Sequence, residues 1–160
     1  MAAREVRLTW SEVRLAAEVG ISRQIRRLYN GSAQTFGAKP DEAWERHITG
    51  ALGELATAKY LGRYWGGVTD QTGPGDLGDG LEVRHTRRND GRLIVHDTDP
   101  DTAAIYLATG CEPVFNIRGW ILAGDAKRPH YWTDPGTGRP AYFVPQADLI
   151  QDHDYDGRPF

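Results

Sequence analysis

Apolar residues recur every three to four positions in residues 11–29, which is the spacing of one face of an α-helix. Thr9 or Ser11 can serve as the N-cap of this helix, and Asn30-Gly31 forms a stop signal at its other end. We therefore expect one helix here.

A second helix is expected from Pro40-Asp41 to about Leu61, ending at Gly62. Its apolar residues fall within one stripe on a helical projection, so this face should pack on a sheet: Trp44, Ile48, Ala51, Leu52, Leu55 and Ala58.

Glycines interrupt both helical segments. Gly20 lies in the middle of the first and is a point where that helix can bend or split. Gly50 and Gly53 lie in the second, where each costs about 1 kcal/mol relative to alanine. We expect another part of the chain to approach the backbone closely at these two positions.

After the second helix the sequence changes to short apolar runs separated by turn residues. Asp79-Gly80 favours a two-residue turn, because both positions tolerate positive φ. The flanking residues 76–78 and 81–86 are therefore expected to pair as a β-hairpin.

Other strands are expected where β-branched and aromatic residues cluster: around Trp65 and Val68, and in residues 92–96, 104–108 and 114–123. Residues 127–139 and 152–160 are expected to be irregular. A sheet preceded by helices indicates an α/β (α+β) fold.

Composition indicates one domain over residues 1–160, with 39% hydrophobic and 26% charged residues. Cys111 is the only cysteine, which excludes a disulfide framework and a cysteine-based zinc site. No apolar run has the roughly 18 residues of a membrane helix, so we expect no membrane partner and a cytoplasmic location. The oligomeric state stays open, with a homodimer among the alternatives.

The net charge of −3 argues against bulk attraction to nucleic acid but not against a local basic face. Residues 1–39 contain seven Lys or Arg and three Glu, whereas residues 133–160 contain five Asp and two Arg. If nucleic acid is bound, we expect contacts from the first helix and from the arginines after the hairpin: Arg23, Arg26, Arg27, Arg87 and Arg88.

Acidic residues flank the predicted turn. Glu82 and Arg84 are two positions apart on a strand and should point to the same face. Asp76 lies on the partner strand, so the turn should bring its carboxylate near Glu82. Two close carboxylates repel unless a cation or a shared proton relieves the repulsion, and oxygen ligands suit Mg²⁺ or Mn²⁺.

One arrangement in this sequence resembles that of the PD-(D/E)XK nucleases. It consists of a helix with a Glu, then an acidic residue, a turn, and Glu-x-base on the next strand. Asp76, Glu82 and Arg84 match the hairpin motif, and Glu54 in GALGELATAKYLG matches the helix glutamate. The resemblance implies a restriction-endonuclease-like core with a mixed central sheet flanked by helices. That core would span residues 41–123, with an N-terminal helical extension (1–37) and a loop-rich C-terminal segment (124–160).

The resemblance also implies metal-dependent hydrolysis of DNA. Asp76, Glu82 and Glu54 would hold Mg²⁺ or Mn²⁺, and Arg84 would contact the scissile phosphate, with His47 and His85 as supporting groups. The family usually has Lys where this chain has Arg84, and arginine cannot act as a general base. The family also usually has a helix after this strand, and none is expected between residues 86 and 114.

The chain is similar as well to small actinobacterial phage proteins that share phrases like GALGELA, DLG, EVR, RGWI and FVP. That similarity covers roughly residues 9–150 and implies the cytoplasm of a phage host.

Non-catalytic interpretations also fit the sequence. The same fold can serve as a catalytically inactive nucleic-acid- or protein-binding module, or as a virion or host-takeover interaction protein. Alternating Glu and Arg is common on any solvated sheet face. Four aromatic residues are candidates for a base-stacking surface, although ordinary packing explains such residues more often: Trp120, Trp132, Tyr142 and Phe143.

Overall fold

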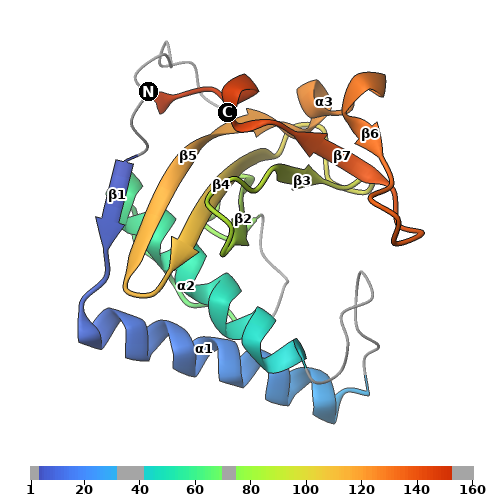
Figure 1. Ribbon diagram of the computed structural model, residues 1–160. Helices are drawn as coiled ribbons and strands as arrows, with labels where there is room; N and C mark the ends of the chain where they lie inside the picture. Colours follow the sequence, from blue (N-terminus) through green and yellow to red (C-terminus); the bar gives the residue numbers. More distant parts are fainter. Residues whose placement is uncertain (1–3, 32–41, 70–74, 153–160) are drawn as a thin grey trace.

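One long helix, α2 (Ala43–Leu61), covers one face of a mixed β-sheet, a second long helix, α1 (Trp10–Tyr29), packs against α2, and a smaller sheet lies against the other face of the mixed sheet (Figure 1). The computed structural model describes residues 4–31, 42–69 and 75–152. The predicted combination of helices with a mixed sheet is confirmed. None of the described helices is both long and apolar enough to cross a membrane.

Helix α1 spans Trp10–Tyr29, and Thr9 rather than Ser11 is its N-cap. The Thr9 hydroxyl accepts a hydrogen bond from the Glu12 amide (3.3 Å), and the Glu12 carboxylate accepts one from the Thr9 amide (2.6 Å). The helix runs unbroken through Gly20. A Cβ at this position would collide with the backbone of Ile48, so Gly20 is needed for the crossing of two helices and causes no bend.

Helix α2 spans Ala43–Leu61 and ends at Gly62, which has the left-handed φ of 64° typical of a helix C-cap. The expected start at residues 40–41 lies outside the described residues. Gly53 packs against the Cβ atom of His85, 2.8 Å from an added Cβ, as expected. The same expectation is wrong for Gly50, because no described atom lies within 4 Å of an added Cβ there.

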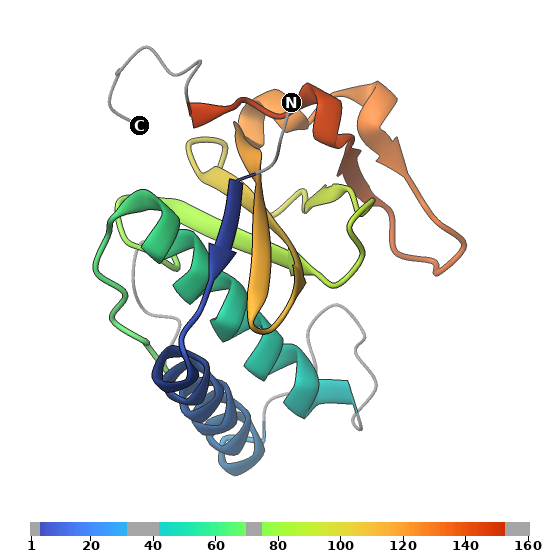
Figure 2. The same ribbon diagram turned by 60° about the vertical axis from the view of Figure 1, so that its left-hand side comes forward.

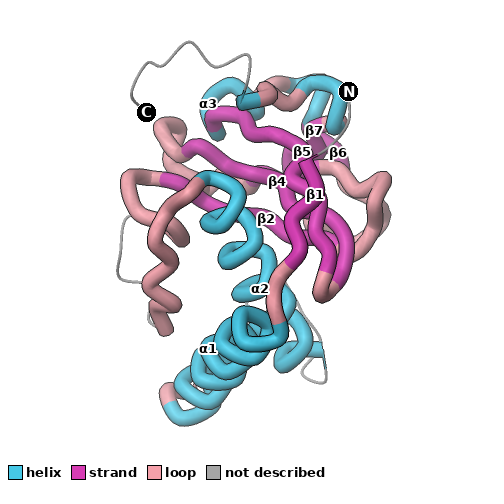
Figure 3. Tube along the Cα trace, turned by 90° about the vertical axis from the view of Figure 1, so that its left-hand side faces the viewer, coloured by secondary structure: helices cyan, strands magenta, loops and turns pink. Residues whose placement is uncertain are grey.

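The larger sheet has the strand order β1-β5-β4-β2 (Figures 2 and 3). It contains β1 (Arg4–Arg7), β5 (Val114–Leu122), β4 (Ala104–Cys111) and β2 (Leu81–Thr86). Strands β2 and β4 are parallel, whereas the other pairs are antiparallel. Because β1 forms one edge of this sheet, the N-terminal segment is part of the main sheet as well as a helical extension.

The turn at Asp79-Gly80 forms as predicted, with φ values of 52° and 74° and a 2.9 Å hydrogen bond from the Leu81 amide to the Gly78 carbonyl. The predicted hairpin is wrong. Residues 76–78 form turns instead of a strand, and β2 is paired in parallel with β4. The expected strand around Trp65 and Val68 does not form either.

The smaller sheet has the order β3-β7-β6. It contains β3 (Leu93–Val95), β7 (Ala141–Val144) and β6 (Trp132–Thr133). The C-terminal region also contains α3 (Ala123–Ala126) and two short 3-10 turns, η3 (Pro129–Tyr131) and η4 (Gln146–Asp148). The C-terminal region therefore has more regular structure than predicted. As expected, no helix lies between residues 86 and 114, and β3 lies on the connection from β2 to β4.

Candidate functional site

Strand β2 carries the predicted motif at the edge of the larger sheet. Leu81 and Val83 are buried in the core between this sheet and the helices. Glu82 and Arg84 alternate with them and therefore point to the opposite face, where each side chain is 26% exposed. The expectation that Glu82 and Arg84 share a face is confirmed.

Arg84 joins two carboxylates. One terminal nitrogen lies 3.3 Å from Glu82 Oε2, and the other donates a 2.9 Å hydrogen bond to Asp99 Oδ1. Asp99 is held in place because its second oxygen accepts a hydrogen bond from the His96 amide (2.8 Å). Sequence reasoning missed this role of Asp99, since the DTDPD segment reads as a turn and gives no sign of a contact with Arg84.

Asp76 caps the free edge of β2. Its Oδ2 accepts a 2.8 Å hydrogen bond from the Val83 amide, which has no partner strand on this side among the described residues. The negative charge of Asp76 acts on both Glu82 and Glu54. Burial, followed by the repulsion from Asp76, raises the pKa of Glu82 to about 7. The turn therefore brings Asp76 near Glu82, as predicted.

Glu54 is buried on α2 and has partners of its own. Its two oxygens accept hydrogen bonds of 2.6 and 2.8 Å from Arg23, and Oε2 accepts another from the Trp65 indole (3.1 Å). Burial raises the pKa of Glu54, and the bonds from Arg23 oppose that rise. The Arg23 side chain is only 16% exposed and also donates to the Val68 carbonyl (2.9 Å). Arg23, expected on a nucleic-acid-binding face, is instead an internal ion-pair partner.

The three predicted metal ligands do not form one compact set. Asp76 adjoins Glu82, but both Glu54 oxygens are engaged by Arg23. Within residues 4–31, 42–69 and 75–152, no group of three or more His, Cys, Asp or Glu side chains has an arrangement that could hold a metal ion. As arranged here, the residues do not fit the three-carboxylate centre that the resemblance implies. Cation binding by Asp76 and Glu82 stays a prediction.

The two histidines named as supporting groups lie elsewhere. The His85 ring packs on Gly53 of α2, and its Nε2 lies 2.9 Å from the Gly110 carbonyl. It is therefore on the face of the sheet opposite Glu82 and Arg84. Burial lowers the pKa of His85, and burial together with Arg27 lowers the pKa of His47.

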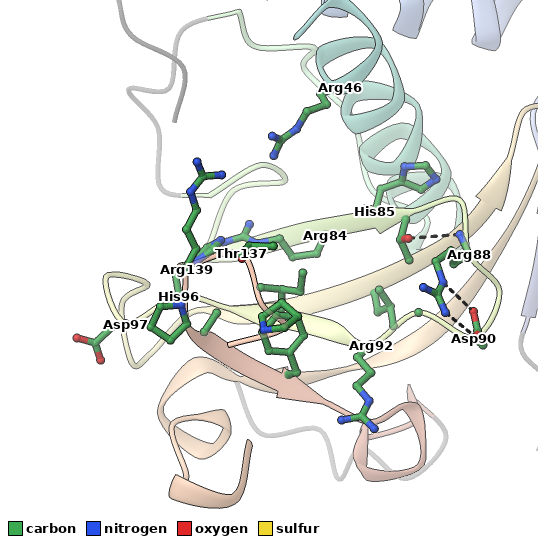
Figure 4. Close-up of a pocket in the computed structure, with 18 of the residues that line it drawn as sticks. Arg46, Arg84, His85, Arg88, Asp90, Arg92, His96, Asp97, Thr137 and Arg139 are labelled. Atoms are coloured by element: carbon green, nitrogen blue, oxygen red, sulfur yellow. Dashed lines mark hydrogen bonds and ion pairs between the residues drawn. The ribbon is translucent and has the colours of Figure 1, made fainter. Parts of the chain in front are cut away.

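A groove of about 980 Å³ opens beside β2, the last strand of the larger sheet, and is lined by side chains from both faces of that strand (Figure 4). One wall is formed by the first part of α2 and by β2. The other is formed by β3, β7 and residues 135–140. Among the described residues, two histidines (His85 and His96) and two acidic residues (Asp90 and Asp97) line the groove. Five arginines line it as well: Arg46, Arg84, Arg88, Arg92 and Arg139.

The arginines of this groove differ in their partners. Arg88 donates hydrogen bonds of 3.1 and 3.0 Å to Asp90, and Arg84 is held by Glu82 and Asp99. The exposed guanidinium groups of Arg46 and Arg92 make no hydrogen bond or ion pair with the described residues. The groove therefore presents positive charge that its own acidic residues leave uncompensated.

Of the five arginines predicted to contact nucleic acid, Arg88 is the one that lines this groove. Arg87 pairs with Glu45 (3.2 Å) and Glu112 (3.4 Å). Arg26 and Arg27 lie on α1, in the helical layer (Figure 1). Sequence reasoning missed Arg46 and Arg139, because their positions in the same groove depend on how α2 and residues 135–140 pack around β2.

Comparison with known proteins finds no match: no family model, no curated protein and no solved structure corresponds to this chain. The candidate site is therefore interpreted from its own geometry and charge.

Proposed function

We propose that this protein binds nucleic acid, with the phosphate backbone held in the groove beside β2. The observation that carries the proposal is the gathering of five arginines around one groove; the guanidinium groups of Arg46 and Arg92 have no hydrogen-bond or ion-pair partner among the described residues. Guanidinium groups suit phosphate because they can donate two parallel hydrogen bonds to its oxygens.

The overall charge does not oppose this function. The chain has a net charge of −3, but binding depends on the local field. Among the described residues, five arginines and two aspartates line the groove, and Glu82 and Asp99 pair with one of these arginines, Arg84. Phosphates that approach Arg46 and Arg92 do not have to displace a carboxylate of the described residues. These two residues should therefore contribute most to binding.

Fluorescence anisotropy with labelled oligonucleotides tests the proposal. A hydrogen bond to a charged group contributes about 1.5–3 kcal/mol, so Arg46→Gln and Arg92→Gln should each weaken binding by roughly tenfold or more. Arg7→Gln is the matched control, because Arg7 is exposed on β1, at the opposite edge of the same sheet. Binding that is absent, or that Arg7→Gln weakens as much as the groove variants, would contradict the proposal.

Phosphodiester hydrolysis by a PD-(D/E)XK-like site is the second candidate. The observation that favours it is the position of Arg84, which lines the groove and also contacts Glu82, the neighbour of Asp76. The order of α2 with Glu54, the turn and the Glu82-x-Arg84 strand supports a restriction-endonuclease-like core. In this candidate, Asp76 and Glu82 would provide oxygen ligands for Mg²⁺ or Mn²⁺.

Cleavage is tested by incubation with supercoiled, linear and branched DNA, with Mn²⁺ and with chelator. A nuclease should cut at least one substrate in a Mn²⁺-dependent manner, and Glu82→Gln should stop the cutting while oligonucleotide binding remains. Binding without cutting, together with no thermal shift on addition of Mn²⁺, would leave nucleic-acid binding as the function and exclude the hydrolytic candidate.

A further inference from the structure

Part of the groove is apolar. On β3, Leu93 and Val95 are fully buried between the two sheets, so the alternating residue Ile94 points to the outer face, where it is 36% exposed. On β7, Phe143 lies directly opposite Ile94 in the antiparallel register. Both residues line the groove. Ile94 and Phe143 therefore form an apolar surface inside an otherwise basic groove.

Basic groups lie beside this apolar surface. Arg92 and His96 are two positions before and after Ile94, at the ends of β3, and both line the groove. Arg84 and Arg139 line it from β2 and from residues 135–140, and Figure 4 shows Arg46 extending toward it from α2. The ligand that fits has negative charges along a backbone and flat apolar faces alongside them.

We infer that the occupant of the groove is a single strand of nucleic acid whose bases stack on Phe143 and Ile94 while its phosphates contact the arginines; this rests on the proposed function. An unpaired strand exposes the faces of its bases, and aromatic side chains stack on such faces with little dependence on sequence. A duplex keeps its bases stacked inside, so it can offer phosphates to the arginines but nothing to Phe143.

Size points to the same occupant. A volume of about 980 Å³ is at the upper end of the roughly 300–1,000 Å³ that is typical of ligand pockets. A groove of this volume can admit a few unpaired nucleotides. Binding of a duplex would leave the apolar surface formed by Ile94 and Phe143 in contact with water.

Three probes of equal length separate the contributions of bases and phosphates: a twelve-nucleotide thymidine strand, an abasic strand with the same phosphates, and a twelve-base-pair duplex. Binding is measured by fluorescence anisotropy at one fixed salt concentration. From the usual contribution of base–aromatic stacking, about 1–3 kcal/mol, the thymidine strand should bind about 5- to 150-fold more tightly than the abasic strand. A ribose version of the strand identifies which sugar is preferred.

Variants at position 143 locate the effect. Phe143→Leu keeps apolar volume but removes the ring, and should reduce the preference for thymidine over abasic strand about tenfold while leaving duplex binding unchanged. Phe143→Tyr retains the ring and should preserve the preference. Thermal unfolding of both variants checks that the fold is intact, and the three-probe comparison on the unmodified protein remains decisive if a variant fails to fold.

The possible outcomes distinguish a failure of the single-strand inference from a failure of the proposed function on which it rests. Equal binding of thymidine strand, abasic strand and duplex would overturn the single-strand inference while phosphate binding in the groove still held. A preference for the thymidine strand that Phe143→Leu leaves intact in a folded protein would also overturn it, because the bases would then stack elsewhere. Failure of all three probes to bind would overturn the proposed function itself.

Discussion

Replacing Glu82 by glutamine should change how the stability of the protein depends on pH. Burial and the nearby charge of Asp76 raise the pKa of Glu82 to about 7, against 4.5 for an unperturbed glutamate. The folded protein therefore holds a proton on this side chain over a pH range in which the unfolded chain has released it. The contribution to stability is fully present below pH 4.5 and is lost as the pH rises through about 7.

The magnitude follows from the size of the shift. Each pKa unit corresponds to 1.36 kcal/mol, so a shift from 4.5 to about 7 corresponds to roughly 3 kcal/mol. The Glu82 side chain is only 26% exposed, which limits screening by solvent. Because Glu82 and Asp76 interact, the titration belongs in part to the pair.

Urea denaturation of the unmodified protein and of Glu82→Gln, at intervals from pH 4.5 to 8, measures this effect. Glutamine does not titrate, so the stability of Glu82→Gln relative to the unmodified protein should rise by about 3 kcal/mol across the range. Glu18→Gln on the exposed surface of α1 controls for the loss of one negative charge. A stability difference that stays constant within about 0.5 kcal/mol across the range would refute the burial and charge assigned to Glu82.

Two further predictions concern the helices and use the same denaturation assay. Arg23→Met leaves the buried Glu54 carboxylate without its main partner, so it should lower the free energy of unfolding by about 3–5 kcal/mol. Glu54→Gln in the same chain should restore much of that loss. A loss below about 1 kcal/mol in Arg23→Met would contradict the ion pair. Gly20→Ala should cost about 1–3 kcal/mol because its Cβ meets the backbone of Ile48, whereas Gly50→Ala should stabilise by up to about 1 kcal/mol. Equal effects of the two alanine substitutions would contradict the close crossing of α1 and α2.

Both long helices could be predicted from sequence because their signals are local. Apolar spacing, the Thr9 cap and Gly62 all act within a few residues of the helix they define. Strand β3 of the smaller sheet was predicted, but strands β1, β6 and β7 were missed for the opposite reason. A strand as short as Arg4–Arg7 or Ala141–Val144 is defined by its pairing with a distant segment, which local sequence does not specify.

The Asp79-Gly80 turn also shows that local backbone conformation could be predicted from sequence, whereas strand pairing could not. Its backbone conformation was predicted correctly, because glycine and aspartate both tolerate positive φ. The hairpin was not correct, because the Asp76 side chain takes the Val83 amide that a partner strand would have bonded, and β4 pairs with β2 on the other side.

The candidate site was predicted in part. The shared face of Glu82 and Arg84 follows from strand alternation, and a carboxylate that is buried on a helix, such as Glu54, needs a partner. That this partner is Arg23, and that Arg46 lies in a groove with Arg92, depends on the packing of α1 and α2 on the sheets.

The salt dependence of oligonucleotide binding tests the central proposal most directly. For single strands, the slope of log K against log salt is about −0.7 for each phosphate contact. The double variant Arg46→Gln, Arg92→Gln should therefore make the slope shallower by about 1.4, while Arg7→Gln should leave it unchanged. An unchanged slope in the double variant, or an equal loss in Arg7→Gln, would show that the groove beside β2 is not where the backbone binds.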